Sequence, residues 1–220
     1  RGDRVICVDN LYTGSEDNIK HHFSNKNFEF LNHDITIPLD VVVDQISNPV
    51  YIPNFIEVLI ESLQGKSHEI VINANRDISK YEIFGYKVVS DKIGGYKGPL
   101  AGLHSALDLY KNSKEDLWFA LFPTDAPIIN TGIIDNFISI TEKKSKVYIC
   151  KIDNIIEPMF SFWSSKIFTE LNEVLLKNNG YKIMKFAEEI GFDYINFKKN
   201  KKIEFFNVND KNDYTELLSF

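Results

Sequence analysis

The sequence predicts an α/β fold, a three-layer sandwich in which a mostly parallel sheet lies between two layers of helices. From about residue 49 onward, short apolar runs typical of strands alternate with amphipathic stretches of roughly ten residues. This alternation indicates parallel strands joined by right-handed helical crossovers. Polar or glycine-rich residues follow the predicted strands. Ligands of such sheets bind at the carboxyl ends of the strands, so we expect the site there.

Composition narrows the class of protein. The chain has 220 residues, of which 44% are hydrophobic and 25% charged, as in ordinary globular domains. The net charge of -6 argues against a nucleic-acid partner. Cys7 and Cys150 form no CxxC motif, which indicates neither a disulfide framework nor a zinc site. No apolar run reaches the ~18–20 residues that span a bilayer. We therefore expect a cytoplasmic protein without a membrane partner.

Residues 1–48 predict a βαβ piece that is distinct from residues 49–220. The boundary is placed at Asn48-Pro49, which interrupts the pattern of regular elements. We expect the first strand of this piece to serve as the first strand of the main sheet. The elements are a strand at Arg4–Asp9, a helix that Ser15 caps, a strand at Phe28–Leu31 and a run at Leu39–Ile46 that fits either strand or helix.

The remaining residues predict six helices and six strands. Helical spacing of apolar residues is clearest between Pro53 and Gly65. Further helices are expected from Pro99, at Ile133–Glu142, after Ser164, at Lys182–Ile190 and at Asp210–Leu218. The predicted strands are Glu69–Asn73, Tyr86–Val89, Leu117–Phe122, Lys146–Cys150, Pro158–Phe162 and Ile203–Val208.

Asp125 is the first candidate for a functional side chain. It lies in Thr124-Asp125-Ala126-Pro127, directly after the apolar strand predicted at Leu117–Phe122. A carboxylate at the end of a strand can coordinate Mg²⁺, with phosphate oxygens completing the shell. An Asx turn ahead of Pro127 would also place an aspartate here. The stretch alone leaves both interpretations open.

A second group of candidates follows the neighbouring strands. Gly98-Pro99-Leu100-Ala101-Gly102 begins a helix, and its glycines would let a ligand approach the backbone near the helix start. A plain Gly-Pro helix start is equally consistent. Asn73 and Asp91 close two strands, where an amide and a carboxylate can read the edge of a purine. Both residue types are also common in turns.

Asn207 and Asn209 are the last candidates. They place two amides at the end of the strand predicted at Ile203–Val208, where they suit a second metal or a hydroxyl. Asn209-Asp210 is also a good cap for the final helix. The five histidines show no ligand spacing, and no GxSxG motif is present. Lys198–Lys202 is basic, and we interpret it as a solvated turn.

Four stretches carry a resemblance to a known family: VINANRDISKYEIFGYKVVSD, GYKGPLAGLHSAL, LWFALFPTDAP and FFNVNDKNDYTEL. In this order they resemble the molybdenum cofactor guanylyltransferases, which are Rossmann-like nucleotidyltransferases. The resemblance runs from about Pro53 to the end of the chain. It implies Mg²⁺-dependent transfer of GMP from GTP to molybdopterin. It also implies GTP and a molybdopterin-type molecule as partners, and transient contact with molybdoenzymes or cofactor-synthesis proteins.

The resemblance also implies roles for individual residues. The guanine would be read at Asn73 and Asp91 and by the backbone of the helix start. Asp125 would be the catalytic metal ligand. Asn207 and Asn209 would lie near the pterin phosphate and the metal, and Glu157-Pro158 would face the second substrate. The residues of the helix start are Gly98, Pro99, Leu100, Ala101 and Gly102.

One feature of the family has no counterpart here. The family begins with a strand and a glycine-rich loop of the LAGGxSxRMG kind, followed by a lysine, which together hold the triphosphate. No such loop precedes the helix at Pro53. Because that loop neutralises charge in the transition state, we expect weak or absent turnover even if GTP binds.

The beginning of the chain resembles a different family. RVICVDNLYTGSEDNIKHHFSNKNFEFLNHDITIPL is similar to the NAD-dependent sugar-nucleotide epimerases and dehydratases, most closely UDP-glucuronate decarboxylase. The alternative functions are therefore a fragment of such an NAD-dependent enzyme or a non-catalytic chimeric remnant. The residues that this resemblance assigns to NAD are Asp9, Asn10, Gly14, Asp34 and Ile35.

Overall fold

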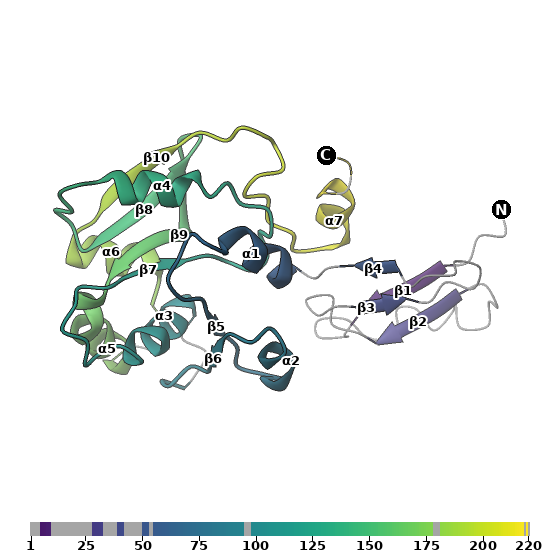
Figure 1. Ribbon diagram of the computed structural model, residues 1–220, viewed down its shortest axis with the longest axis horizontal. Coiled ribbons are helices and arrows are strands. Elements are labelled where there is room, and N and C mark those ends of the chain that lie inside the picture. Colours follow the sequence, from purple (N-terminus) through teal and green to yellow (C-terminus); the bar gives the residue numbers. More distant parts are fainter. Residues whose placement is uncertain are drawn as a thin grey trace. The chain divides into compact units, whose positions relative to one another are not determined.

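The computed structural model describes residues 5–9, 28–32, 39–41, 50–52, 55–94, 98–177, 181–217 and 219 (Figure 1). The chain divides into two compact units, Arg1–Val58 and Leu59–Phe220. None of the helices in the described ranges combines the length and the apolar character that a membrane span requires. The helix predicted after Ser15 lies outside the described residues, as do Asn10, Gly14, Asp34 and Ile35.

The described residues of the first unit form two short strand pairs. Strands β1 (Val5–Asp9) and β2 (Phe28–Asn32) pair in parallel, from Val5 opposite Phe28 to Asp9 opposite Asn32. Strands β3 (Leu39–Val41) and β4 (Val50–Ile52) form an antiparallel pair. The expectation that Arg4–Asp9 is the first strand of the main sheet is wrong, because β1 forms its ladder with β2 in a two-stranded sheet.

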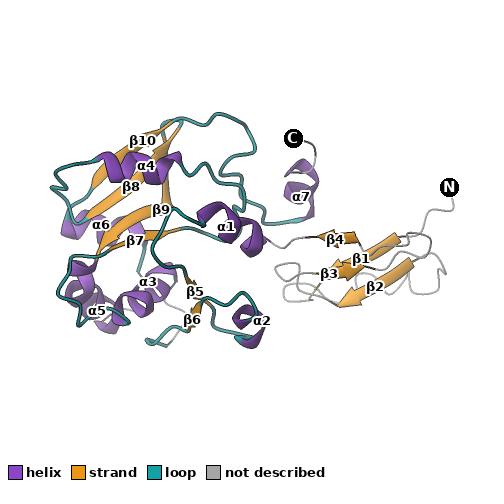
Figure 2. Ribbon diagram, viewed as in Figure 1, coloured by secondary structure: helices purple, strands orange, loops and turns teal. Residues whose placement is uncertain are grey.

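The second unit is built on a four-stranded sheet and a separate parallel pair (Figure 2). The pair consists of β5 (Val71–Asn73) and β6 (Lys87–Val89). The larger sheet has the order β10-β8-β9-β7, so the apolar strand β7 lies at its edge. Its strands are β7 (Trp118–Leu121), β8 (Val147–Ile152), β9 (Ile155–Ser164) and β10 (Asp193–Phe197).

Most of the predicted helices are present at the expected places. Pro99 occupies the first turn of α3. Ser164 caps the short 3-10 turn η3 (Ser165–Ile167) that leads into α5, because its side chain accepts a hydrogen bond from the Lys166 N–H. The helices are α1 (Phe55–Leu63), α2 (Ser79–Glu82), α3 (Pro99–Asp108), α4 (Gly132–Ser139), α5 (Phe168–Lys177), α6 (Ile183–Ile190) and α7 (Lys211–Leu217).

Strand β8 shows that the second unit has three layers. Side chains alternate between the two faces of a strand. Val147 and Ile149 pack with buried residues of α3, α5 and α6. Tyr148, Cys150 and Ile152 point the other way and pack with α4. The sheet therefore has helices on both faces, as the sequence predicts.

The prediction of a mostly parallel sheet is confirmed only in part. Strands β8 and β10 are parallel, whereas β9 is antiparallel to both β8 and β7. The reason is the two-residue turn Asp153-Asn154 between β8 and β9. Both residues have positive φ, 48° and 68°. Such a turn matches the twist of an antiparallel hairpin and reverses the chain immediately.

The strand predicted at Ile203–Val208 is wrong. The position beside β8 is taken by β10, whose residues Asp193–Phe197 the pattern analysis did not assign to a strand. The segment at 203–208 is instead a turn followed by irregular backbone. Phe205 has a φ of 58°, a left-handed value that interrupts any strand there. Asn207 and Asn209 therefore do not lie at a strand end.

Candidate functional site

The first cluster of site residues is a polar network at the ends of β5 and β6. The Asn73 side-chain amide donates to Oδ1 of Asp91 at 3.0 Å and to the Val89 carbonyl at 3.2 Å. The Asn75 amide donates to Oδ2 of Asp91 at 3.0 Å, and its own oxygen accepts from the Asp91 backbone N–H at 2.8 Å. Two amides thus fix both oxygens of one partly exposed carboxylate.

Gly102 lets this network lie against helix α3. A methyl group added at Gly102 would come within 2.4 Å of the Asn73 side-chain oxygen and 2.8 Å of its Cγ. Both distances are far below van der Waals contact. A glycine is therefore required inside the helix, although glycine lowers helix stability. Gly102 thus has a packing role against Asn73, and its contact with a ligand stays a prediction.

The start of α3 has two different surfaces. Gly98, at the cap position, has a φ of 76°, which favours glycine. Gly98 and Pro99 are exposed. Leu100 and Ala101 are fully buried, and Leu100 packs into the core. The exposed part of this stretch is therefore Gly98 and Pro99, and the Ala101 N–H already donates to the Gly98 carbonyl at 2.9 Å.

Asp125 lies in the loop that follows β7. Its carboxylate is half-buried, and burial raises its pKa, an effect that a backbone hydrogen bond partly offsets. Its Oδ1 is buried without a hydrogen-bond partner. An unsatisfied buried carboxylate oxygen is unfavourable and rare in folded proteins. A cation would satisfy it, so this atom fits a metal ligand better than an Asx turn.

The pair Asn207 and Asn209 flanks the residue that fixes Asp125. The N–H of Val208 donates to the Asp125 carbonyl at 2.7 Å, and Val208 is buried. Both asparagines are exposed on either side of it. The Asn209 N–H donates to Oδ2 of Asp213 at 2.9 Å. The sequence predicted that the two asparagines follow a strand, which is wrong. They lie near Asp125 because the backbone of Val208 is hydrogen-bonded to the backbone of Asp125.

Glu157 lies in β9 opposite Cys150, next to an irregularity in the ladder. Its side chain is partly buried, and burial raises its pKa, while the nearby positive charge of Lys199 acts in the opposite direction. The Pro158 carbonyl accepts a hydrogen bond from the Ser161 hydroxyl at 2.8 Å.

Both clusters follow the carboxyl ends of strands, although these strands belong to two separate sheets. Gly102, in the first turn of α3, lies against Asn73 at the carboxyl end of β5. The chain then enters β7 and reaches Asp125 after its carboxyl end. This is the end at which α/β sheets hold their ligands.

Two supporting residues were missed by pattern analysis. Asn75 holds Asp91 from the side opposite Asn73. Ser105 of α3 is buried, and its hydroxyl accepts from the Lys92 N–H at 2.8 Å, which fixes the backbone after Asp91. Each is a lone polar residue whose partner is more than ten positions away, so the sequence carried no local signal for it.

Comparison with known proteins identifies the family. The family model of the MobA-like NTP transferase domain matches residues 50–190, which is more than half of the chain. The chain belongs to this family. The molybdenum cofactor guanylyltransferase of Vibrio atlanticus is 29% identical over 161 residues, which are 73% of this chain and 79% of that protein. The enzyme of the same name from Haemophilus influenzae is 31% identical over 150 residues, 63% of this chain and 76% of that protein.

Solved structures agree on the fold of this MobA-like NTP transferase domain. Molybdopterin-guanine dinucleotide biosynthesis protein A of Archaeoglobus fulgidus has a TM-score of 0.59 and 18% identity, and covers 75% of this chain and 84% of its own. A Mycobacterium tuberculosis protein in complex with manganese has a TM-score of 0.56 and 14% identity, with coverages of 76% and 88%. The Rossmann-like fold class is thereby confirmed.

A short match of another kind supports the resemblance of the N-terminal piece. UDP-glucuronic acid decarboxylase 2 of Arabidopsis thaliana is 56% identical over 46 residues, which are 21% of this chain and 10% of that protein. Besides the MobA-like NTP transferase domain, the chain is thus similar over a short stretch to a small part of this decarboxylase.

Proposed function

We propose that the chain binds GTP with a divalent cation and transfers GMP to the phosphate of molybdopterin. An oxygen of the acceptor phosphate would attack the α-phosphorus of GTP. The bond from that phosphorus to the bridging oxygen would break, and pyrophosphate would leave with the bonding electrons. The match to the MobA-like NTP transferase domain and the names of its relatives support this assignment. Contacts with molybdoenzymes and a cytoplasmic location stay predictions.

The observation that carries the proposal is the unpartnered Oδ1 of Asp125. A divalent cation bound there would withdraw negative charge from the phosphates. We assign Mg²⁺, which typically binds one or two carboxylates together with substrate phosphates. In the described part of the chain, no group of three or more His, Cys, Asp or Glu side chains could hold a metal. We therefore expect the ligands of the metal to be one carboxylate and phosphate oxygens. The manganese complex of a structural neighbour is consistent with a divalent ion.

The network around Asp91 supports guanine as the base. Guanine presents two adjacent N–H donors, on N1 and on the exocyclic N2, whereas adenine presents no such pair. Each carboxylate oxygen has two acceptor positions. In Asp91 each oxygen accepts one amide hydrogen, from Asn73 or Asn75, which leaves a further position on each. Asp91 would accept both guanine donors while the amides hold it in place.

The experiment compares GTP and ATP binding and then measures pyrophosphate release with molybdopterin. We expect Mg²⁺-dependent GTP binding, weak ATP binding and slow turnover, because the glycine-rich loop of the family is not found before the helix at Pro53. Asp91→Asn replaces one acceptor oxygen by a donor, so GTP affinity should fall roughly 10–100-fold, the equivalent of one charge-assisted hydrogen bond. ATP binding should not change. Equal binding of both nucleotides by the unmodified chain would refute the assignment of the base.

The match to the decarboxylase supports NAD binding as the second candidate. Asp9, the residue that would bind the adenosine ribose, is the last residue of β1. NAD bound at the N-terminal unit should not be displaced by GTP, because the two sites would use different residues. A competition titration separates the candidates: displacement of NAD by GTP would contradict two independent sites.

A further inference from the structure

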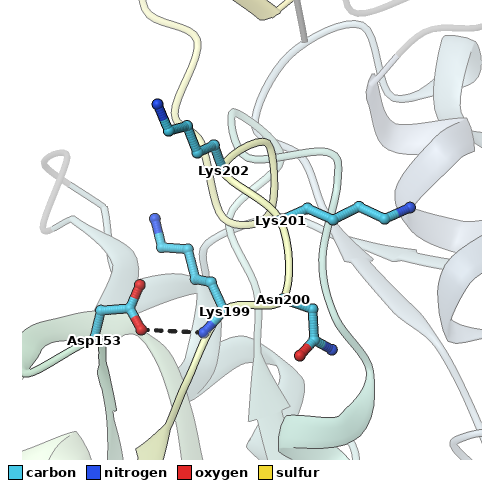
Figure 3. A pocket seen from close by; sticks show the side chains of 5 residues that line it. All are labelled: Asp153, Lys199, Asn200, Lys201 and Lys202. Atoms are coloured by element: carbon cyan, nitrogen blue, oxygen red, sulfur yellow. Dashed lines mark hydrogen bonds between the residues drawn. The ribbon is translucent and has the colours of Figure 1, made fainter.

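A basic pocket follows strand β10 and has no role in the proposed chemistry. Its walls are Asp153, from the turn between β8 and β9, and four residues of the next loop, Lys199, Asn200, Lys201 and Lys202. The pocket is open and has a volume of about 270 Å³. Figure 3 shows the side chains of Lys199 and Lys202 extending to the same side of the loop, whereas Lys201 extends to the other.

The backbone of this loop is anchored at two points. The Lys199 N–H donates to Oδ1 of Asp153 at 3.2 Å (Figure 3). The Asn200 N–H donates to Oε2 of Glu204 at 2.9 Å. Glu204 is itself buried, and both of its oxygens lie 3.2 Å from the side-chain amide of Asn130. The backbone that carries these lysines is therefore held in place, which lowers the backbone entropy lost on ligand binding.

The charges of the loop are not balanced by its surroundings. Lysines at 198, 199, 201 and 202 outnumber the carboxylates of Asp153, Glu157 and the buried Glu204, in a chain whose net charge is -6. Several lysines elsewhere form ion pairs, for example Lys166 with Asp116 at 2.7 Å. Among the described ion pairs, none involves a lysine of this loop. The local excess of positive charge suits an anion.

The loop lies at the same end of the sheet as Asp125. Strands β8 and β10 are parallel, and β9 is antiparallel to both β8 and β7, so β7, β8 and β10 all run in one direction. The loop follows the carboxyl end of β10. The same chain segment then reaches Val208, whose N–H donates to the Asp125 carbonyl.

We propose that this pocket binds a phosphate group of a small molecule, between the ammonium groups of Lys199 and Lys202. The site goes beyond the proposed function because it uses neither Asp125 nor a metal. Two sources of the phosphate share this chemistry, the polyphosphate tail of a nucleotide and a phosphate monoester on an acceptor. Lysine binds phosphate as a point charge, so the pocket should accept either geometry.

The test uses inorganic pyrophosphate as the probe, in the presence of EDTA. The chelator removes any cation at Asp125, so the result does not depend on the proposed nucleotide site. The variant Lys199→Gln/Lys202→Gln keeps both side chains polar, shortens each only slightly and removes two charges. Its matched control, Lys114→Gln/Lys144→Gln, removes two charges at exposed positions outside the pocket. Calorimetric titration at about 0.1 M salt measures the affinity of each protein.

We expect the pocket variant to bind pyrophosphate about tenfold more weakly and the control to change by less than about twofold, since exposed charges are screened beyond roughly 10 Å at 0.1 M salt. If GTP binding in EDTA weakens in parallel, the source is the nucleotide tail; if it does not, the source is the acceptor. Equal losses of pyrophosphate affinity in the two variants would show that only the net charge matters, which would overturn the proposed site. No measurable pyrophosphate binding by the unmodified chain would also overturn it.

Discussion

The contact between Gly102 and Asn73 gives the sharpest test of how the site is built. In Gly102→Ala the new methyl group would lie 2.4 Å from the Asn73 oxygen. The asparagine must then rotate, because the helix backbone at this position is fixed by the buried residues Leu100, Ala101 and Leu103. Rotation breaks the hydrogen bonds of Asn73 to Asp91 and to the Val89 carbonyl.

The expected change in the unfolding free energy of Gly102→Ala is the sum of two opposing contributions. Replacing glycine by alanine inside a helix stabilises it by about 1 kcal/mol. Losing one hydrogen bond to a carboxylate and one to a carbonyl costs about 2–3 kcal/mol, at the lower end of the usual range because Asn73 is exposed. Gly102→Ala should therefore destabilise the protein by about 1–2 kcal/mol. In an Asn73→Ala background the clash is gone, and the same substitution should stabilise by about 1 kcal/mol.

The assay is a double-mutant cycle measured by urea unfolding of the single variants, Gly102→Ala and Asn73→Ala, and of the double variant. We expect a coupling of at least about 2 kcal/mol between the two positions. GTP affinity should fall in both single variants, because both displace an amide that fixes Asp91. Additive effects on unfolding, or a stabilising Gly102→Ala in the unmodified background, would refute the contact.

Three further predictions address charge and packing. Asp125→Asn should stabilise the metal-free protein by about 1 kcal/mol at neutral pH. The pKa of Asp125 is raised in the folded state, so the charged carboxylate destabilises the fold. This destabilisation is absent at a pH below the pKa of an ordinary carboxyl group and appears as the pH rises through the pKa of the folded protein. A difference in unfolding free energy between Asp125→Asn and the unmodified chain that stays flat from pH 3 to 8 would contradict this. The Phe137 ring is 6% exposed and stacks on Phe162 with a centroid distance of 4.2 Å. Phe137→Ala should therefore lower the free energy of thermal unfolding by about 3–5 kcal/mol. The neighbouring Ile138 is 61% exposed, and Ile138→Ala should lower it by less than about 0.5 kcal/mol. Glu204→Gln places an amide donor against the N–H groups of Asn130 and Asn200 and should destabilise by about 1–3 kcal/mol; an unchanged unfolding midpoint would show that these hydrogen bonds contribute nothing.

Local patterns predicted most elements of the second unit correctly. The apolar periodicity between Pro53 and Gly65 corresponds to α1, and the Gly-Pro pair corresponds to the start of α3. Short apolar runs marked β5 to β9. Asn73 and Asp91 were expected to lie together because they end neighbouring strands, and the structure joins them by a hydrogen bond. Such features depend on residues close in the chain, which sequence patterns record.

Features that depend on distant residues were not predictable in the same way. Asp193–Phe197 and Ile203–Val208 have similar composition, and only pairing with β8 and the left-handed backbone of Phe205 decide between them. The Val208 N–H that fixes Asp125 comes from a segment more than eighty positions away. The antiparallel β9 had a local signal, since Asp153-Asn154 suits a tight hairpin turn, but the alternation of helices and strands outweighed it.

In the proposed reaction, Asp125 holds a cation against the phosphates of GTP. The most direct test of this role is a calorimetric titration of GTP into the unmodified chain and into Asp125→Asn, each with Mg²⁺ and with EDTA. We predict that Mg²⁺ strengthens GTP binding to the unmodified chain by about tenfold or more, whereas the variant binds with the same weak affinity under both conditions. An equal gain from Mg²⁺ in the two proteins would show that Asp125 is not the metal ligand.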